Sequence, residues 1–314
     1  MGRVASGPPR SYTTTVMAQT AAPTTSLDEA YSYCEGLARS HYENFSVVTR
    51  FLPRRLRHAM YSVYAFCRHT DDLGDEAEGD RLALLDEWED DLRRTVDGAP
   101  RHPILQALQR TIEEHAMPLS PFLKLVEANR MDQRTQRYPA YDDLLHYCDH
   151  SANPVGRMVL SVFGYNDEER QRLSDATCTA LQLANFWQDV RRDFDMGRIY
   201  LPLEDMARFD YSESELQAGV VNDRFRRLMA FEVDRARELF REGVKLVDMV
   251  DGELRVDLKL FTMGGMSVLD AIEKQDYDVL SRRPVVSKAR KLRLMASATV
   301  RLAAQRFTGG RGHG

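Results

Sequence analysis

Residues 181–202 read LQLANFWQDVRRDFDMGRIYLP, an apolar stretch that carries Asn185, Asp189 and Asp193 at four-residue intervals. Side chains four apart lie on one face of an α-helix, so this spacing predicts a helix with a polar stripe on an otherwise core-like surface. Like charges stacked in this way repel, and a buried amide or carboxylate is costly unless it finds a partner. A bound cation is the natural partner, and oxygen ligands suit a hard divalent ion.

A second acidic cluster lies upstream, in the stretch YSVYAFCRHTDDLGDE at residues 61–76. Asp71 and Asp75 share a helix face, and Arg68 precedes Asp71 by about one turn, near enough to bind the same anion as a metal ion. This short cluster alone fits a solvated acidic turn equally well. Two such clusters in one helical chain favour Mg²⁺ held between two carboxylate helices, in a site for a diphosphate leaving group.

The rest of the chain predicts a helical fold. From residue 27 onward apolar residues recur every three or four positions, alternating strand patterns are nearly absent, and short links carry Pro, Gly or Asp. Ser26 and Pro53 suit helix starts, Gly98 suits a helix end, and residues 141–164 form one continuous helical segment in this interpretation. We predict a single all-α domain of about ten helices over residues 27–306, with a disordered leader over 1–26 and a flexible tail over 307–314.

Composition excludes several classes of protein. The chain of 314 residues is 43% hydrophobic, and its formal net charge of −5 gives no electrostatic case for binding nucleic acid. Four scattered cysteines without a CxxC pair argue against structural zinc and against a disulfide framework, and they favour a cytoplasmic location. No apolar run is long enough to span a bilayer.

The C-terminal segment 282–306 differs from the rest of the chain, because it holds eight basic residues and no acidic one in an amphipathic pattern. Two interpretations fit this pattern. The segment is either a surface helix that packs on the body or a peripheral anchor to anionic lipid at the inner membrane face.

The two stretches YAFCRHTDDLGDE and LQLANFWQDVRRDFDMGRIYLP together resemble the squalene/phytoene synthase family, all-α isoprenoid synthases that join or rearrange prenyl diphosphates. The resemblance spans about residues 27–290 and implies the class I terpenoid synthase fold, a central active-site cavity and Mg²⁺ as cofactor. The implied metal ligands are Asp71, Asp75, Asn185, Asp189 and Asp193; the implied substrate- and diphosphate-binding residues are His41, Phe45, Arg68, Tyr147, Gln182 and Arg198; and the implied catalytic tyrosines are Tyr64 and Tyr200.

Three departures from the family pattern narrow the implied reaction. Glu43 stands where members often carry a basic residue, and Gln188 replaces the arginine that usually precedes the aspartate of the second motif. Asn153 and Pro154 stand where many members have small residues. The loss of two cations weakens the case for holding two diphosphates at once, and the pattern resembles the bacterial hydroxysqualene synthase branch. That branch is similar to enzymes that convert presqualene diphosphate, made by a sister synthase, to hydroxysqualene, which a separate flavoprotein reduces.

Ionisation of presqualene diphosphate gives a carbocation that water must capture. We expect the catalytic residue Asn153 to place that water, and aromatic faces such as Phe45, Tyr64 and Phe66 to stabilise the cation, although core packing also explains Phe66. One alternative is a condensing synthase that makes presqualene diphosphate, dehydrosqualene or phytoene from farnesyl or geranylgeranyl diphosphate. The predicted metal-binding carboxylates by themselves are also compatible with a terpene cyclase. A non-catalytic assembly protein of the same fold is a further alternative, against which the two intact acidic clusters argue.

Overall fold

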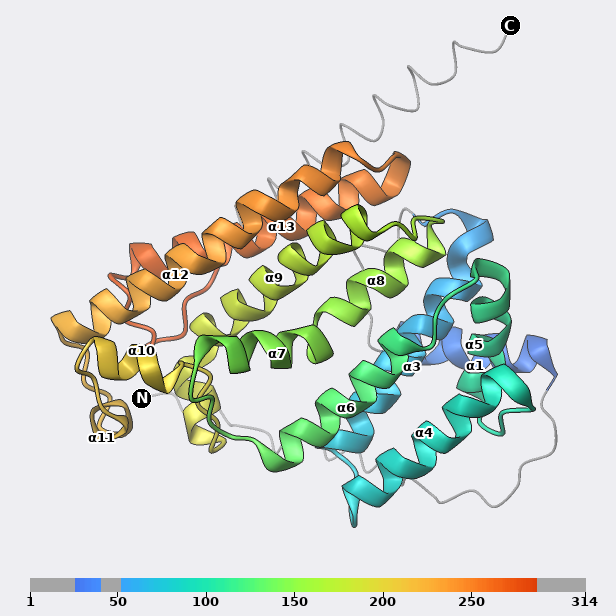
Figure 1. Cartoon of the computed structure of the whole chain (residues 1–314), viewed down its shortest axis with the longest axis horizontal. Helices are drawn as coiled ribbons and strands as arrows, with labels where there is room; N and C mark the ends of the chain where they lie inside the picture. The colour runs from blue at the N-terminus through green and yellow to red at the C-terminus, as the bar shows by residue number, and fades with distance from the viewer. Residues whose placement is uncertain (1–25, 41–51, 287–314) are drawn as a thin grey trace, which may run out of the picture.

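The computed structural model describes residues 26–40 and 52–286, and in these ranges the chain is built from helices (Figure 1). Within these ranges the only β-type pairing is an isolated bridge between Arg137 and Ile199. This confirms the predicted all-α fold class. The α-helices are α1 (Leu27–Ser40), α3 (Arg57–Asp75), α4 (Arg81–Asp97), α5 (Pro103–His115), α6 (Ser120–Arg134), α7 (Tyr141–Ser151), α8 (Asn153–Val162), α9 (Glu168–Asp195), α10 (Leu203–Arg208), α11 (Glu213–Gln217), α12 (Asp223–Gly243) and α13 (Gly252–Lys274), with the 3-10 helices η1 (Arg54–Leu56) and η2 (Val244–Asp248).

Several predictions fall on residues outside these ranges. They are the leader over residues 1–25, the tail over 307–314, the basic segment beyond residue 286, and the candidate residues His41, Glu43 and Phe45.

Local sequence signals set several helix ends. Ser26 and Glu29 form a reciprocal pair at the start of α1: the Ser26 Oγ accepts from the Glu29 backbone N–H at 3.3 Å, and Glu29 Oε2 accepts from the Ser26 N–H at 2.8 Å. Gly98 ends α4 as predicted. The segment expected to be continuous over residues 141–164 is instead divided into α7 and α8 at Ala152, because Pro154 lacks the backbone N–H that would continue the helix and its ring crowds the preceding turn.

Two large hydrophobic cores, with a small third cluster around Leu160 and Leu173, hold the helices. The first lies among α1, α3, α4, α5, α6 and α8 and contains Phe66 and Phe122, which are fully buried. The second lies among α7 and α9 to α13 and contains Trp187 and Phe225. Helix α9 is 28 residues long, and α12 and α13 run beside it (Figure 1). The two acidic motifs therefore stand on helices of different cores, α3 and α9, and only the packing of one core against the other can bring them together.

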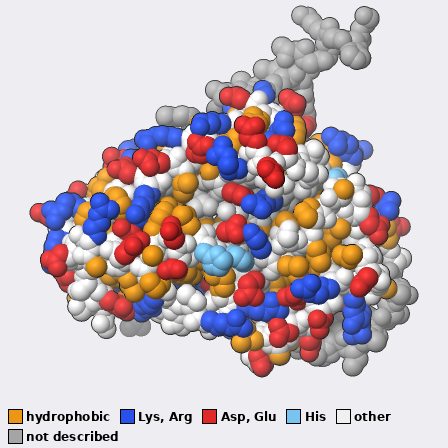
Figure 2. All heavy atoms as spheres, viewed as in Figure 1, with side chains coloured by type: hydrophobic (Ala, Val, Ile, Leu, Met, Phe, Trp, Pro, Cys, Tyr) orange, Lys and Arg blue, Asp and Glu red, His pale blue; other side chains and the backbone are white. Residues whose placement is uncertain are grey.

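The surface shown in Figure 2 carries acidic and basic side chains intermingled, with histidines gathered over α7. Among the residues that the structure describes, no helix is both long and apolar enough to cross a membrane.

Candidate active site

The first acidic motif lies at the end of α3. Arg68 pairs within the same helix, with its Nη2 at 2.5 Å from Asp72 Oδ1 and 2.8 Å from Glu76 Oε1. Asp71 faces α6, where the amide of Asn129 approaches its Oδ1 at 3.5 Å. The guanidinium of Arg68 therefore points toward Asp72 and Glu76.

Asp71 is open to solvent on one side and approached by protein atoms of α6 on the other. These protein atoms reduce its hydration and raise the pKa of its carboxyl to about 7, and the neighbouring charge of Asp75 acts in the same direction. A cation bound between these two carboxylates would relieve both effects.

The second acidic motif lies in the last three turns of α9. Arg283, from the segment after α13, holds Asp189 with both ends of its guanidinium, Nε to Oδ1 at 2.5 Å and Nη2 to Oδ2 at 2.9 Å. Burial, followed by the charge of Asp189 one turn away, raises the pKa of the Asp193 carboxyl to about 7. The second motif therefore also places two carboxylates one turn apart, and one of them already has a guanidinium as its partner.

Arg198 connects the two motifs. It follows α9 immediately after the turn at Gly197, whose positive φ of 85° suits a residue without a Cβ. Its Nη2 lies 3.3 Å from Oδ1 of Asp75, which is 123 residues away in the sequence. The turn that ends one acidic helix therefore places a guanidinium against the other acidic helix.

Helix α6 adds a third acidic group beside Arg198. Burial raises the pKa of the Asp132 carboxyl to about 6, while the charge of Arg198 opposes the rise. The Tyr147 hydroxyl donates to Asp132 Oδ2 at 3.1 Å, and Oδ1 of the same carboxylate is buried without a hydrogen-bond partner. This unsatisfied oxygen is costly in a closed protein interior and marks a place where a ligand can contribute a donor or a cation.

Four aromatic rings gather next to these charges. Phe186 and Tyr200 stack with ring centroids 3.7 Å apart, and Tyr147 and Tyr138 lie 6.0 and 5.7 Å from Tyr200. Burial raises the pKa of the Tyr147 and Tyr200 phenols, so both stay neutral and keep their protons as donors. The site therefore places carboxylate oxygens next to the faces of buried aromatic rings.

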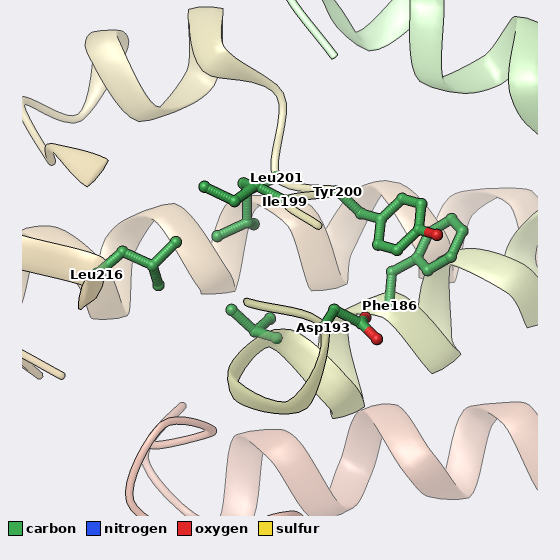
Figure 3. A pocket seen from close by; sticks show the side chains of 7 residues that line it. Phe186, Asp193, Ile199, Tyr200, Leu201 and Leu216 are labelled. Atoms are coloured by element: carbon green, nitrogen blue, oxygen red, sulfur yellow. The ribbon is translucent and has the colours of Figure 1, made fainter. Parts of the chain in front are cut away.

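Figure 3 shows the stacked rings of Phe186 and Tyr200 close to the Asp193 carboxylate, at a pocket whose empty volume is about 200 Å³. That space includes open solvent, and the part of it that admits a water molecule measures only about 10 Å³, far below the roughly 300–1,000 Å³ typical of ligand pockets. The pocket is therefore too small to be the expected central cavity, which stays a prediction. Its lining residues are Phe186, Val190, Asp193, Ile199, Tyr200, Leu201 and Leu216.

The remaining candidates occupy less central positions. Tyr64 is half-buried on α3, one turn before Arg68, and Gln182 is half-buried on α9, one turn before the exposed Asn185. Asn153 is buried at the start of α8, where its Oδ1 accepts a hydrogen bond of 2.9 Å from the Thr179 hydroxyl of α9.

Sequence reasoning missed the contribution of α6. Asn129, Asp132 and Gln133 lie at i, i+3 and i+4 and form a polar stripe that faces the site. The Gln133 amide donates to the backbone carbonyl of Gly74, inside the first motif, at 2.9 Å. The same periodicity argument that found the aspartates could have found this stripe.

Sequence reasoning also missed Arg283, and no local pattern marks it. Its Nη2 donates to Oε1 of Gln188 at 3.0 Å, and the Gln188 amide donates to the Pro284 carbonyl at 2.6 Å. The inference that glutamine at position 188 removes a positive charge from the second motif is therefore not supported, because another segment of the chain supplies a guanidinium there.

The donor set fits a divalent metal ion in part. Among the described residues no three carboxylate, imidazole or thiol groups converge closely enough to hold a metal ion by themselves. The carboxylates and the amide of the two motifs are nevertheless the oxygen ligands that Mg²⁺ prefers, and Mg²⁺ is usually bound by one or two carboxylates together with substrate phosphates. Two ligand sets on separate helices suit such shared binding.

Comparison with known proteins gives consistent relatives. The sequence model described as squalene/phytoene synthase matches residues 38–290. A 15-cis-phytoene synthase of Synechococcus elongatus is 34% identical over 88% of this chain and 94% of its own. The crystal structure of squalene synthase HpnC from Alicyclobacillus acidocaldarius is 52% identical, with a TM-score of 0.78 over 80% of this chain and 95% of that chain. A dehydrosqualene synthase structure is 26% identical, with a TM-score of 0.77 over 88% of this chain and 98% of that chain.

These relatives define a class of enzyme. They are synthases that use prenyl diphosphates and that generally depend on a divalent metal ion, typically Mg²⁺.

Proposed function

Because this chain belongs to the squalene/phytoene synthase family, we propose that it is a Mg²⁺-dependent hydroxysqualene synthase, which converts presqualene diphosphate and water to hydroxysqualene and diphosphate. The observation that carries this proposal is the 52% identity to squalene synthase HpnC, against 31–34% for eight phytoene synthases. Glu43 and the pair Asn153–Pro154 support it as departures from the pattern of condensing members.

The charged end of the site suits departure of a diphosphate. As the C–O bond breaks, negative charge accumulates on the leaving group, and fixed cations aimed at that position lower the barrier. Arg198 lies between the two motifs, and a guanidinium can bind two phosphate oxygens at once. When bound by Asp71, Asp75, Asn185 and Asp189, Mg²⁺ supplies Lewis-acid stabilisation of the same charge.

The aromatic end suits protection of the carbocation that remains. Tyr147, Phe186 and Tyr200 present neutral rings, and a ring face stabilises a cation by roughly 0.5–2 kcal/mol. Their burial also keeps bulk water away from the carbocation, so that only a water molecule held within the site can react with it. The site thereby separates the leaving anion from the rearranging cation.

Asn153 is the residue proposed to place that water. The hydrogen bond from Thr179 fixes its carbonyl, so its amide N–H groups keep one orientation. Asn153→Ala should lower the yield of hydroxysqualene and release other C30 products, whereas Thr179→Ser keeps the hydroxyl and serves as the matched control. An unchanged product profile in Asn153→Ala means that this residue has no such role.

A condensing synthase is the second candidate, and two observations favour it. The curated relatives are phytoene synthases, and Arg283 restores the positive charge that the sequence at Gln188 lacks. Such an enzyme would join two farnesyl or two geranylgeranyl diphosphates.

A product assay with purified protein and Mg²⁺ in the absence of NADPH separates the two candidates. Presqualene, farnesyl and geranylgeranyl diphosphates are supplied in turn. Hydroxysqualene formed from presqualene diphosphate, with no product from the other two, is the expected result. Presqualene diphosphate or a C30 or C40 polyene formed from the shorter substrates overturns the proposal in favour of a condensing synthase.

A further inference from the structure

The segment that follows α13 is attached to α9 through one side chain. Gln188 is 7% exposed, and its amide uses both ends: the oxygen accepts from Arg283 Nη2 at 3.0 Å, and the nitrogen donates to the Pro284 carbonyl at 2.6 Å. An amide that accepts from one residue and donates to the next fixes both the side chain and the backbone of the segment. Position and direction of the Arg283 guanidinium are therefore determined together.

The guanidinium held in this way faces the second motif. Its Nε and Nη2 contact the two oxygens of Asp189, whose side chain is only 17% exposed, while the Arg283 side chain is 49% exposed. It therefore lies at the boundary between the motif and solvent. Its neighbour Arg282 carries the same charge, but among the described residues its side chain makes no hydrogen bond or ion pair with the motif.

We propose that Gln188 is a positioning residue that holds Arg283 at the second motif as a diphosphate-binding cation, in place of the arginine that the sequence lacks at position 188. This inference rests on the proposed function only in that the site binds a diphosphate, whichever prenyl chain the substrate carries. Arginine at position 188 would come from the metal-binding helix itself, whereas Arg283 reaches the same place from 94 residues downstream in the sequence.

Calorimetric titration of the full chain with inorganic diphosphate in the presence of Mg²⁺ tests the proposal without turnover. Arg283→Ala should weaken binding about 10- to 100-fold, as expected for loss of a charge-assisted hydrogen bond to the diphosphate. Gln188→Ala should weaken it about 3- to 10-fold, and the double variant should bind no more weakly than Arg283→Ala alone, because the glutamine acts only through the arginine. Arg282→Ala, the matched loss of charge, should bind like the wild type.

A rescue experiment guards against variants that merely unfold. Gln188→Arg in the Arg283→Ala background should restore most of the diphosphate affinity, and circular dichroism melts of all variants without ligand verify folding. Additive losses in the double variant, equal losses for Arg282→Ala and Arg283→Ala, or failure of the rescue would each overturn the proposal. The substrate assay is independent: a phytoene product would refute the hydroxysqualene function and leave this inference intact.

Discussion

The two acidic motifs look alike in sequence and differ in how their charge is balanced. In the first, Arg68 belongs to the same helix and pairs with Asp72, one turn away, while the distant Arg198 contacts only Asp75. In the second, the counterion of Asp189 is Arg283, which comes from another segment. A local pattern can therefore reveal acidic residues that need a cation, but it reveals the counterion only when that counterion lies on the same helix.

The largest expected effect comes from removing one carboxylate from each motif. The double variant Asp71→Asn, Asp189→Asn should lose turnover by at least ~10³-fold, because a metal ion contributes several kcal/mol and each 1.4 kcal/mol is worth a factor of about ten. Mg²⁺-dependent substrate binding should be lost with it, as measured by steady-state kinetics and calorimetry. Retained activity would show that the two motifs do not hold metal. Asp248→Asn, a surface change outside both motifs, is the control.

Next in size is the connection between the motifs. Arg198→Ala should lower kcat/KM about 10- to 100-fold, since a hydrogen bond to a charged group is worth about 1.5–3 kcal/mol. Arg198→Lys should recover only part of this loss, because an ammonium cannot bind two oxygens in one plane. If alanine and lysine variants match the wild type in steady-state assays, Arg198 does not act on the diphosphate.

A smaller effect concerns the packing of the first motif against α6. A Cβ on Gly74 would lie 2.1 Å from the side-chain oxygen of Asn129, so Gly74→Ala should destabilise the protein by about 1–3 kcal/mol in urea unfolding. Gly36→Ala is the matched control, because no atom lies within 4 Å of its added Cβ and alanine favours the helix by roughly 0.5–1 kcal/mol. Equal unfolding midpoints for the two variants would contradict the close approach of α3 and α6.

The last prediction concerns stability alone and tests a carboxylate outside both motifs. Asp257, 3% exposed on α13, has its pKa raised by burial from 3.8 to about 8. The folded state therefore binds a proton that the unfolded state has released, and this group makes stability fall as pH rises from about 4 to about 8.

Asp257→Asn removes that dependence. The variant should gain at least ~1 kcal/mol over the wild type between about pH 5 and pH 8, measured by urea unfolding at each pH. Parallel stability curves for variant and wild type would mean that Asp257 is not buried in a protonated form. Asp248→Asn again provides the surface control.

The sequence was a good guide to elements whose causes are local. The capping pair at Ser26 and the end of α4 at Gly98 follow from neighbouring residues, and periodic apolar positions predicted the helices. The break between α7 and α8 was missed because the apolar periodicity continues across it. Pro154, in the first turn of α8, is the local signal that could have predicted it. Short helices such as α10 and α11 were also missed, since five or six residues carry too little periodicity.

By itself, the sequence determined the helical class, the family and the two sets of aspartates, because these depend on residue type and spacing along one helix. Only the tertiary structure decided which distant groups meet these aspartates: Arg198 at Asp75, Asn129 at Asp71 and Arg283 at Asp189. Such contacts depend on how two separate hydrophobic cores pack together. Burial of apolar surface favours that packing without regard to sequence distance, so no local pattern records which charges it brings together.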